Sequence, residues 1–356
     1  MMKQKLMAVV VAGALAAPAM VLADTAIYGS FNAEYGKVTM PDRAAAGTSF
    51  NNWDGMNSGA SYLGFKGEEK LDGGMAAFYQ CESDVRFLAG PATPATLCAR
   101  NSAVGLKGAF GAVSIGTWDS PQKIAVGKTR ITADTGWLGV THLLLRESNR
   151  NSNSINYSLP DFGGISIGLQ TTTTNAASDT TTPGNTGRRN GANAVYAQGP
   201  LILAVALTSE SDNAAGGVAG DKDTSTSLGA AYTFGPVKVG FTYVTDKQHR
   251  AASDTERRSW NLAGTYNLPG PHSLWAGYTV AGDKKVSTGA GANTGGTEYQ
   301  LGYANQLSKR TLLALGYGSV KNGSAGTNYK IGDTAATGLA AGSSSSVLTL
   351  QLKHNF

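Results

Sequence analysis

The two cysteines of the chain, Cys81 and Cys98, are the residues whose type and spacing most directly indicate a covalent link. They lie 98 − 81 = 17 residues apart. A disulfide between them would close a short loop and stabilise the fold by about 3 kcal/mol on the chain-entropy argument. A metal site or a catalytic thiol is less favoured, because no histidine and no second cysteine pair accompanies them. We predict a disulfide, which an exported chain would retain.

Residues that carry enzyme chemistry form no recognisable arrangement. None of the four histidines stands beside a metal-ligand partner or a Ser/Asp pair with familiar context. Residues 105–108 (GLKG) do not make a phosphate loop, because no helix follows that could direct N–H groups at an anion. Asp221 and Asp223 could hold calcium at a loop tip, but solvated loop charge is the favoured interpretation. The sequence therefore predicts neither an enzyme nor a cofactor.

The first 23 residues have the pattern of a secretory signal. Lys3 and Lys5 give a basic start, residues 6–22 are almost wholly apolar, and Ala23 is the small residue that signal peptidase prefers. A short transmembrane anchor is the alternative, but no basic stop-transfer residues follow. We predict a signal peptide at 1–23 and one mature domain at 24–356, with a net charge of 5 − 2 = +3. That charge, spread over a large domain, makes no basic patch for a nucleic-acid partner.

Alternation with a period of two recurs along the chain as far as its C-terminus. In residues 347–353 large apolar side chains alternate with polar ones, and in residues 201–208, 237–243 and 261–268 they alternate with side chains that are mostly small or polar. Such alternation is typical of β-strands that have one apolar face. A membrane barrel turns that face to lipid, whereas a soluble sandwich buries it. The alternation by itself leaves both folds open.

Turn residues separate these segments in an asymmetric way. Short turn sequences alternate with longer polar stretches along the chain. Short turns at one end of the barrel and long loops at the other end are typical of outer-membrane barrels. A bilayer also requires every backbone N–H and C=O to be paired, so the last strand must meet the first. Seven turns and eight loops connect 16 strands, which predicts an all-β, transmembrane antiparallel β-barrel in outer-membrane lipid. The turns are at residues 71–74, 108–111, 160–164, 199–200, 235–236, 269–271 and 308–310, and the loops are near residues 37–60, 86–98, 118–150, 174–190, 210–223, 248–256, 282–295 and 321–344.

Several segments, in order along the chain, carry a family resemblance. They are residues 61–69 (SYLGFKGEE) with their continuation to Glu82, residues 100–108 (RNSAVGLKG), residues 153–157 with 160–164, residues 307–311, Ile27-Tyr28-Gly29 and the terminal Phe356. Together they resemble the Gram-negative general diffusion porins, closest to the beta-proteobacterial branch. The resemblance implies a sixteen-stranded barrel, usually a homotrimer, inserted by the outer-membrane assembly machinery through a C-terminal strand that ends at Phe356. It also implies that the third extracellular loop, about residues 118–149, folds inward and narrows the lumen.

By that resemblance, the charged residues of the third loop and its surroundings line a pore constriction. A narrow constriction strengthens the field of each charge compared with bulk water, and an excess of basic groups there favours anions. For any single residue the alternative is a side chain that only solvates a loop. The predicted constriction set is Arg100, Asp119, Lys123, Lys128, Arg130, Asp134, Arg146, Glu147 and Arg150, and the predicted pore lining adds Glu34, Tyr62, Glu68, Glu82 and Thr117.

Two departures from the family pattern weaken the expected basic wall. The family commonly has basic residues where Tyr62 and Thr117 stand, whereas Arg100 is retained. Weak anion selectivity or near-neutrality is therefore expected. Strict alternation back from Leu106 gives Arg100 the lipid-facing parity, so a lumen position for Arg100 requires a β-bulge between the two residues.

These observations together predict a passive diffusion channel for small hydrophilic solutes and ions across the outer membrane. The alternative is a barrel that acts mainly as an adhesin or a scaffold, which long Thr-, Ser- and Gly-rich loops fit equally well. A charged, inward-folded loop favours the channel, because a plugged scaffold has no use for one.

Overall fold

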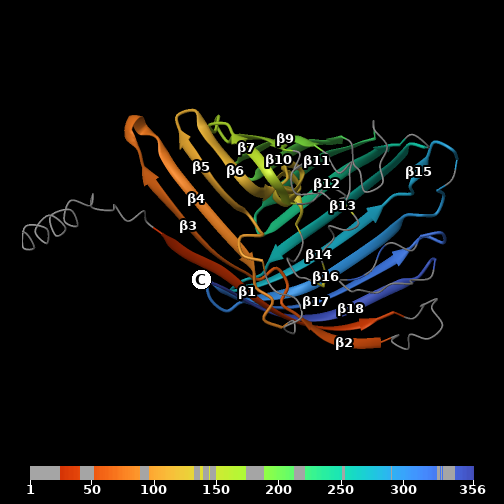
Figure 1. Ribbon diagram of the computed structural model, residues 1–356. Coiled ribbons are helices and arrows are strands. Elements are labelled where there is room, and N and C mark those ends of the chain that lie inside the picture. Colours follow the sequence, from red (N-terminus) through yellow and green to blue (C-terminus); the bar gives the residue numbers. More distant parts are fainter. Residues whose placement is uncertain are drawn as a thin grey trace, which may run out of the picture.

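The computed structural model describes residues 25–40, 52–88, 96–131, 137–138, 144, 150–173, 188–211, 221–250, 253–289, 291–326, 329, 331 and 341–356. The predicted signal peptide at 1–23 lies outside these residues. Within them the chain is almost entirely strand (Figure 1). The segments are β1 (Ala26–Thr39), β2 (Asn52–Asn57), β3 (Tyr62–Lys70), β4 (Ala76–Asp84), β5 (Ser102–Gly108), β6 (Gly111–Asp119), β7 (Arg150–Ser158), β8 (Ile165–Thr172), β9 (Arg188–Gln198), β10 (Leu201–Ser211), β11 (Lys222–Phe234), β12 (Val237–His249), β13 (Thr255–Asn267), β14 (His272–Ala281), β15 (Lys285–Val286), β16 (Gly296–Gln306), β17 (Thr311–Asn322) and β18 (Ser344–Asn355), with one α-helix, α2 (Pro121–Thr129), and a short 3-10 turn, η1 (Asp72–Gly74).

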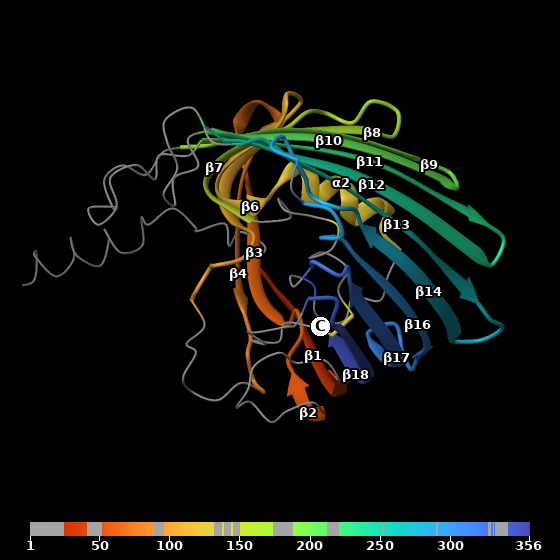
Figure 2. The same cartoon turned by 90° about the vertical axis from the view of Figure 1, so that its right-hand side faces the viewer.

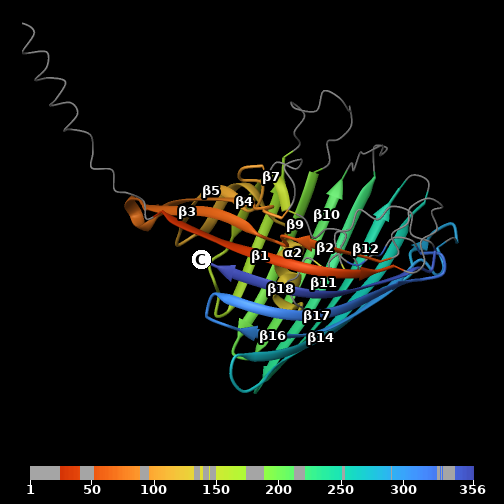
Figure 3. The ribbon, with the colours of Figure 1, turned by 90° about the horizontal axis from the view of Figure 1, so that it is seen from below.

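The sheet closes on itself, because its first and last strands are hydrogen-bonded neighbours. β1 pairs antiparallel with β18 from Ser30 opposite Asn355 to Thr39 opposite Ser346. Figure 3 shows these two strands side by side. The bilayer tolerates no unpaired strand edge in its hydrocarbon, and closure removes both edges at once.

The 18 strand segments that the described residues form make a barrel of 16 strands. β2 and β3 both pair with β1, so they are two parts of one strand interrupted at residues 58–61. β14 and β15 both pair with β13 and likewise count as one strand. The count is 18 − 2 = 16, which confirms the predicted fold.

The alternation that the sequence shows separates an apolar outer face from a polar inner face. Leu348, Leu350 and Leu352 are 50%, 46% and 49% exposed, whereas Thr349 and Gln351 between them are 1% and 2% exposed. A soluble sandwich would have the opposite arrangement, with leucine buried and glutamine exposed. The exposed leucine face is the one that lipid covers in a membrane barrel.

All seven predicted short turns are present and lie between consecutive strands at one end of the barrel, which we name the short-turn end. The opposite end is the long-loop end. Gly199 and Gly235 both have a φ of +58°, a left-handed conformation that a two-residue hairpin requires and that glycine adopts without strain. These glycines explain why the turns could be placed from the sequence.

Three of the predicted loops contain a complete strand or helix, and in residues 282–295 it is the short strand β15. Residues 37–60 include the end of β1 and all of β2, whose Trp53 packs on Trp137 with ring centroids 5.3 Å apart. Residues 118–150 include α2, which begins where the Ser120 side chain accepts a hydrogen bond from the Lys123 N–H at 3.2 Å and where Pro121 occupies the first helical turn. β2 and α2 are stabilised by contacts across the barrel interior, which local alternation does not report.

The largest apolar cluster formed by the described residues lies inside the barrel rather than around it. Trp137 and Leu138, from the segment after α2, are buried against Val38, Val320 and Val347 of three strands. This cluster fixes the segment to the inner wall. Among the described residues, no helix is long and apolar enough to cross a bilayer.

Candidate pore lining and constriction

Helix α2 lies inside the ring of strands and packs on the inner face of β9 to β12 (Figure 2). The Gln122 side chain donates to the hydroxyls of Ser225 and, at 2.8 Å, Ser227, and the Thr129 hydroxyl is 3.0 Å from that of Thr242. Each of the three wall residues has the inward parity of its strand and is at most 2% exposed. The helix therefore occupies part of the lumen cross-section.

Glycines on the inner wall allow this close approach. A Cβ atom at Gly229 would collide with the Thr129 side chain, and one at Gly240 would collide with the Thr129 carbonyl oxygen. Any larger residue at these positions would move the end of α2 away from the wall. The two glycines thus set how deeply the helix end can sit against β11 and β12.

The segment after α2 reaches the opposite part of the wall at β1. The Trp137 N–H donates to Glu34 Oε2 at 3.2 Å, and the other carboxylate oxygen of Glu34 accepts from Asn32 at 2.6 Å and Gln351 at 3.2 Å. Glu34 is 1% exposed. It has the inward parity that we predicted, but these contacts cover it, so its carboxylate anchors the loop rather than facing open water.

A first charged cluster surrounds Arg100. Its guanidinium lies 2.7 Å from Asp84 Oδ1 and 3.7 Å from Glu82 Oε2, and its centre is 5.0 Å from the centroid of the Tyr62 ring. Glu82 also accepts a hydrogen bond from the Tyr28 hydroxyl at 2.8 Å. The cluster brings together three predicted pore residues, Arg100, Tyr62 and Glu82, and sets two carboxylates against one guanidinium.

The β-bulge that a lumen position of Arg100 requires is present. The ladder between β4 and β5 pairs Gln80 with Ala103 and would place Glu82 opposite Asn101. Instead the Arg100 N–H donates to the Glu82 carbonyl oxygen at 3.0 Å, so one extra residue lies on the Arg100 side. The extra residue reverses the parity, as a bulge does, and turns Arg100 toward Glu82.

A second charged cluster is centred on Asp119. Its carboxylate lies 2.7 Å from Lys123 Nζ and 3.1 Å from Arg150 Nε, and Arg150 also donates to the Asn101 side chain at 3.2 Å. Because Asn101 adjoins Arg100, the two clusters are contiguous. Burial lowers the pKa of the Lys123 ammonium, and the Asp119 carboxylate opposes that change.

One extra residue in β7 brings Arg150 opposite Asp119. Gly116 pairs with Ser154, but Trp118 pairs with Asn151, so the register shifts by one between them. Asn153 has a φ of +53°, the left-handed conformation that asparagine tolerates better than most residues. The sequence gives no local signal for this shift beyond the asparagine itself.

The remaining predicted residues are not part of these two clusters. Glu68 forms an ion pair with Lys107 near the short-turn end, with 2.6 Å between Oε2 and Nζ. Lys128 is exposed on α2, and Arg130 follows the helix as its C-terminal cap. Thr117 pairs with Ser102 and shares the parity of the outward-facing Ile115, so its place in the pore lining stays a prediction. Asp134, Arg146 and Glu147 lie outside the described residues.

Sequence reasoning missed several charged residues of the inner wall. Asp84 belongs to the Arg100 cluster, and Arg189 lies 3.0 Å from Glu210 beside α2. Glu210 has the parity opposite to Leu203 and Leu207, so extending the alternation along β10 would have identified it.

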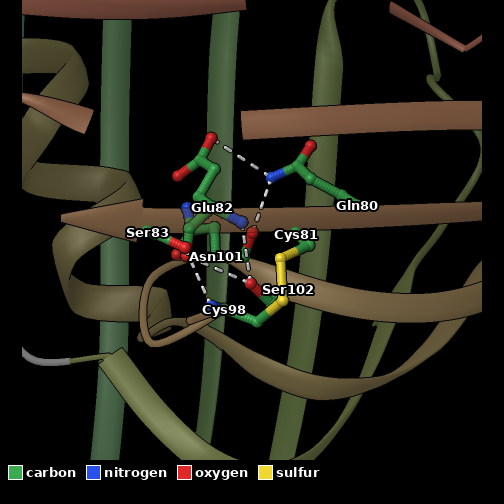
Figure 4. Close-up of a disulfide and its surroundings, with 7 residues drawn as sticks. All are labelled: Gln80, Cys81, Glu82, Ser83, Cys98, Asn101 and Ser102. Atoms are coloured by element: carbon green, nitrogen blue, oxygen red, sulfur yellow. Dashed lines mark hydrogen bonds between the residues drawn. A yellow bond between two sulfur atoms is a disulfide. The ribbon is translucent and has the colours of Figure 1, made fainter. Parts of the chain in front are cut away.

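The predicted disulfide between Cys81 and Cys98 is confirmed (Figure 4). Cys81 pairs with Phe65, whose side chain is exposed on the outer face, so the bridge lies on the outer side of β4. The Cys98 N–H donates to the Ser83 hydroxyl at 2.9 Å. The bridge therefore attaches the loop after β4 to the barrel wall at Cys98, two residues before Arg100, whose side chain points inward.

Comparisons with known proteins agree with this architecture. The sequence profile described as Gram-negative porin matches residues 7–345. The outer membrane porin protein 32 of Delftia acidovorans is 28% identical over 368 residues, covering 100% of both chains. The major outer membrane protein P.IB of Neisseria meningitidis serogroup B is 30% identical over 171 residues, which is 48% of this chain and 49% of that one.

Solved structures share the fold. The anion-selective porin from Comamonas acidovorans has a TM-score of 0.79 at 24% identity and covers 94% of this chain and 100% of its own. The trimer form of OmpT from Vibrio cholerae has a TM-score of 0.66 at 14% identity, covering 93% of this chain and 99% of its own. The family is one of channels rather than enzymes. The chain belongs to the Gram-negative porin family, as an outer-membrane β-barrel whose strands enclose a diffusion channel.

Proposed function

We propose that the channel passes small hydrophilic solutes and ions passively, with a weak preference for anions or nearly none. The observation that carries the proposal is the contiguous pair of charged clusters beside α2. In them Arg100, Lys123 and Arg150 face Glu82, Asp84 and Asp119, so the charges sum to 3 − 3 = 0. Paired charges of both signs in a narrow lumen orient polar solutes without excluding either sign of ion.

Lys128, which is exposed on α2, is the basis for a weak anion preference. It adds one positive charge at the end of α2 to the balanced clusters. The solved Comamonas acidovorans neighbour is titled an anion-selective porin, which supports the same direction. The neutral Tyr62 and Thr117 limit its strength.

Single-channel recording in planar bilayers tests this proposal. When protein purified from the outer membrane inserts into the bilayer, the conductance should rise in steps. In a salt gradient the reversal potential should be small, with the sign that a higher anion than cation permeability gives. Folded protein that inserts but stays silent would contradict the channel and favour the adhesin or scaffold. A strongly cationic reversal potential would contradict the selectivity alone.

We further infer that the chain is exported by cleavage after Ala23 and assembles as a homotrimer. The trimeric Vibrio cholerae structure supports the second inference. Phe356 at the barrel seam, which exchanges two backbone hydrogen bonds with Gly29, is the proposed contact for the outer-membrane assembly machinery. Mass spectrometry of the mature N-terminus and cross-linking in mild detergent check cleavage and assembly separately.

A further inference from the structure

Two tyrosine rings and one lysine extend from the Arg100 cluster toward the short-turn end along the inner wall of β1 and β3. Tyr28, Tyr62 and Lys66 each alternate along their strands with exposed apolar residues of the outer face, so their side chains point into the lumen. The two rings are half-buried and Lys66 is exposed, so a dissolved solute can contact all three. We name Tyr28, Tyr62 and Lys66 the ring–lysine site.

A glycine on the neighbouring strand lets the Tyr28 ring lie flat against the wall. Gly64 is opposite Tyr28 in the ladder of β1 and β3, and a Cβ atom there would be 2.7 Å from Cζ of the ring. The Tyr28 hydroxyl reaches across β3 and donates to Glu82 of β4 at 2.8 Å. One face of the ring therefore rests on the backbone of β3, and the other face is turned to the lumen.

The site combines a π face with a lysine ammonium. Lys66 Nζ lies 4.9 Å from the centroid of the Tyr28 ring, and the Tyr62 ring meets that of Tyr28 edge to face with 6.1 Å between centroids. Among the described residues Lys66 forms no ion pair, whereas the nearby Glu82 accepts from Tyr28 and lies 3.7 Å from the Arg100 guanidinium. The flexible four-carbon stem of a lysine lets its ammonium move from a ring to an approaching anion. The site therefore offers an ion pair and a stacking surface within reach of one small molecule.

Within the described part of the chain, the elements inside the barrel pack on other parts of the wall. α2 packs on β9 to β12, and Trp137 reaches β1 at Glu34. Glu34 is 34 − 28 = 6 residues from Tyr28, which is about 20 Å along a strand. A solute that has passed the charged clusters therefore meets the ring–lysine site before it leaves at the short-turn end.

We propose that the ring–lysine site transiently binds small aromatic carboxylates as they pass through the channel. This inference rests on the proposed diffusion function and adds a class of preferred solute to it. The carboxylate of the solute pairs with Lys66 Nζ, and its ring stacks on the lumen face of the Tyr28 ring, a contact that adds affinity beyond the area it buries. One cation beside one open ring suits a monoanion with a single ring, and an aliphatic acid of equal charge forms the ion pair alone.

Block of the potassium chloride current through single channels by two matched anions tests the proposal. Benzoate and cyclohexanecarboxylate have the same charge and nearly the same size, but only benzoate has a π face. We expect benzoate to halve the conductance at a concentration about fivefold lower than cyclohexanecarboxylate requires, because stacking adds to the ion pair that both anions form. Equal half-block concentrations for the two anions would overturn the proposal.

Two pairs of matched variants locate the effect. K66Q should raise the half-block concentration of benzoate about fivefold through the lost ion pair, whereas K238Q, which removes a lysine that has the inward parity of Gly240 on β12, should not change it. Y28L should reduce the potency of benzoate to that of cyclohexanecarboxylate, whereas Y28F keeps the ring and should behave like the wild type. Equal effects of K66Q and K238Q, or of Y28L and Y28F, would contradict a site built from this lysine and this ring.

Channel opening in plain potassium chloride separates failure of this inference from failure of the proposed function. Wild-type channels that conduct chloride but are blocked equally by the two anions would remove only the preference for aromatic solutes. Folded protein that stays silent would remove both. Stepwise opening of each variant verifies its fold, and the K66Q and K238Q pair decides the question if Y28L does not insert.

Discussion

Arg100 illustrates how one side chain's partners decide what it contributes to a pore. Its guanidinium is matched by Asp84 and Glu82 on the neighbouring strand, and Tyr62 covers its face. Arginine stays charged at neutral pH, but a solute that passes the cluster experiences the combined field of Arg100, Asp84 and Glu82. The sequence identified the arginine and Glu82, whereas their pairing depends on a β-bulge and on Asp84.

Removing the two carboxylates should expose the charge of Arg100. In E82Q/D84N we expect the reversal potential in a salt gradient to move toward anions, with an increase of about twofold or more in the anion-to-cation permeability ratio. A unit charge about 8 Å from the ion path in water contributes about 0.5 kcal/mol, which corresponds to that factor. An E68Q variant, altered near the short-turn end, is the control. No shift in E82Q/D84N relative to the wild type would show that the cluster lies outside the ion path.

Neutralising the basic residues of α2 should have the opposite effect. K123Q/K128Q/R130Q should move the reversal potential toward cations, because Asp119 then keeps only Arg150 as a partner. Assembly should be preserved, since Gln122 and Thr129 still attach the helix to the wall. The absence of any shift, measured on the same bilayers, would place these three residues away from the constriction.

At the scale of the elements, steric fit positions α2 against the inner wall as much as hydrogen bonds do. G240V should displace the chain at Thr129, because its Cβ would collide with the Thr129 carbonyl oxygen. Valine suits a strand, so the barrel should form and only the conductance should change. The control is G264V on the outer face, where the nearest atom would be 3.1 Å away. Equal single-channel conductance in both variants would contradict the position of α2.

The disulfide acts on a different element and should not influence the pore. Because Cys81 lies on the outer side of β4, reducing the bridge should leave single-channel conductance nearly unchanged. Stability should fall by about 3 kcal/mol, the value for a loop of this length. Conductance and heat resistance of the C81S/C98S variant measure the two effects. A large change in conductance would mean that the bridge also positions Arg100.

Elements that follow from local pattern could be predicted from the sequence, and elements that depend on distant contacts could not. Alternation and turn glycines gave 16 strands and all seven short turns. β2 lacks a long alternating run and exists because β1 pairs with it and Trp137 covers Trp53. α2 has a visible start at Ser120-Pro121 but no long apolar stripe, because Gln122 packs on wall serines and only Ala125 contacts an apolar patch formed by Val195, Ala204 and Ala206.

At the scale of the whole molecule, the seam between β1 and β18 holds the barrel together. Deleting Phe356 removes two hydrogen bonds with Gly29 and a ring stacked 5.7 Å from Phe31. We expect a loss of about 2–3 kcal/mol in the free energy of unfolding, measured by urea titration in vesicles. F110A, which truncates an exposed aromatic in a turn at the same end, should cost less. Equal losses would show that the seam has no special role.

The same seam imposes an order of events on biogenesis. The strand that pairs with β1 is β18, which is synthesised after all the other strands. The barrel therefore cannot close while the chain is still being synthesised or exported. Until β18 has been delivered, any sheet that the polypeptide forms has two unpaired edges. The free backbone N–H and C=O groups of such edges can pair with other chains. The barrel can therefore close only after β18 has reached β1, which makes closure the last step of assembly.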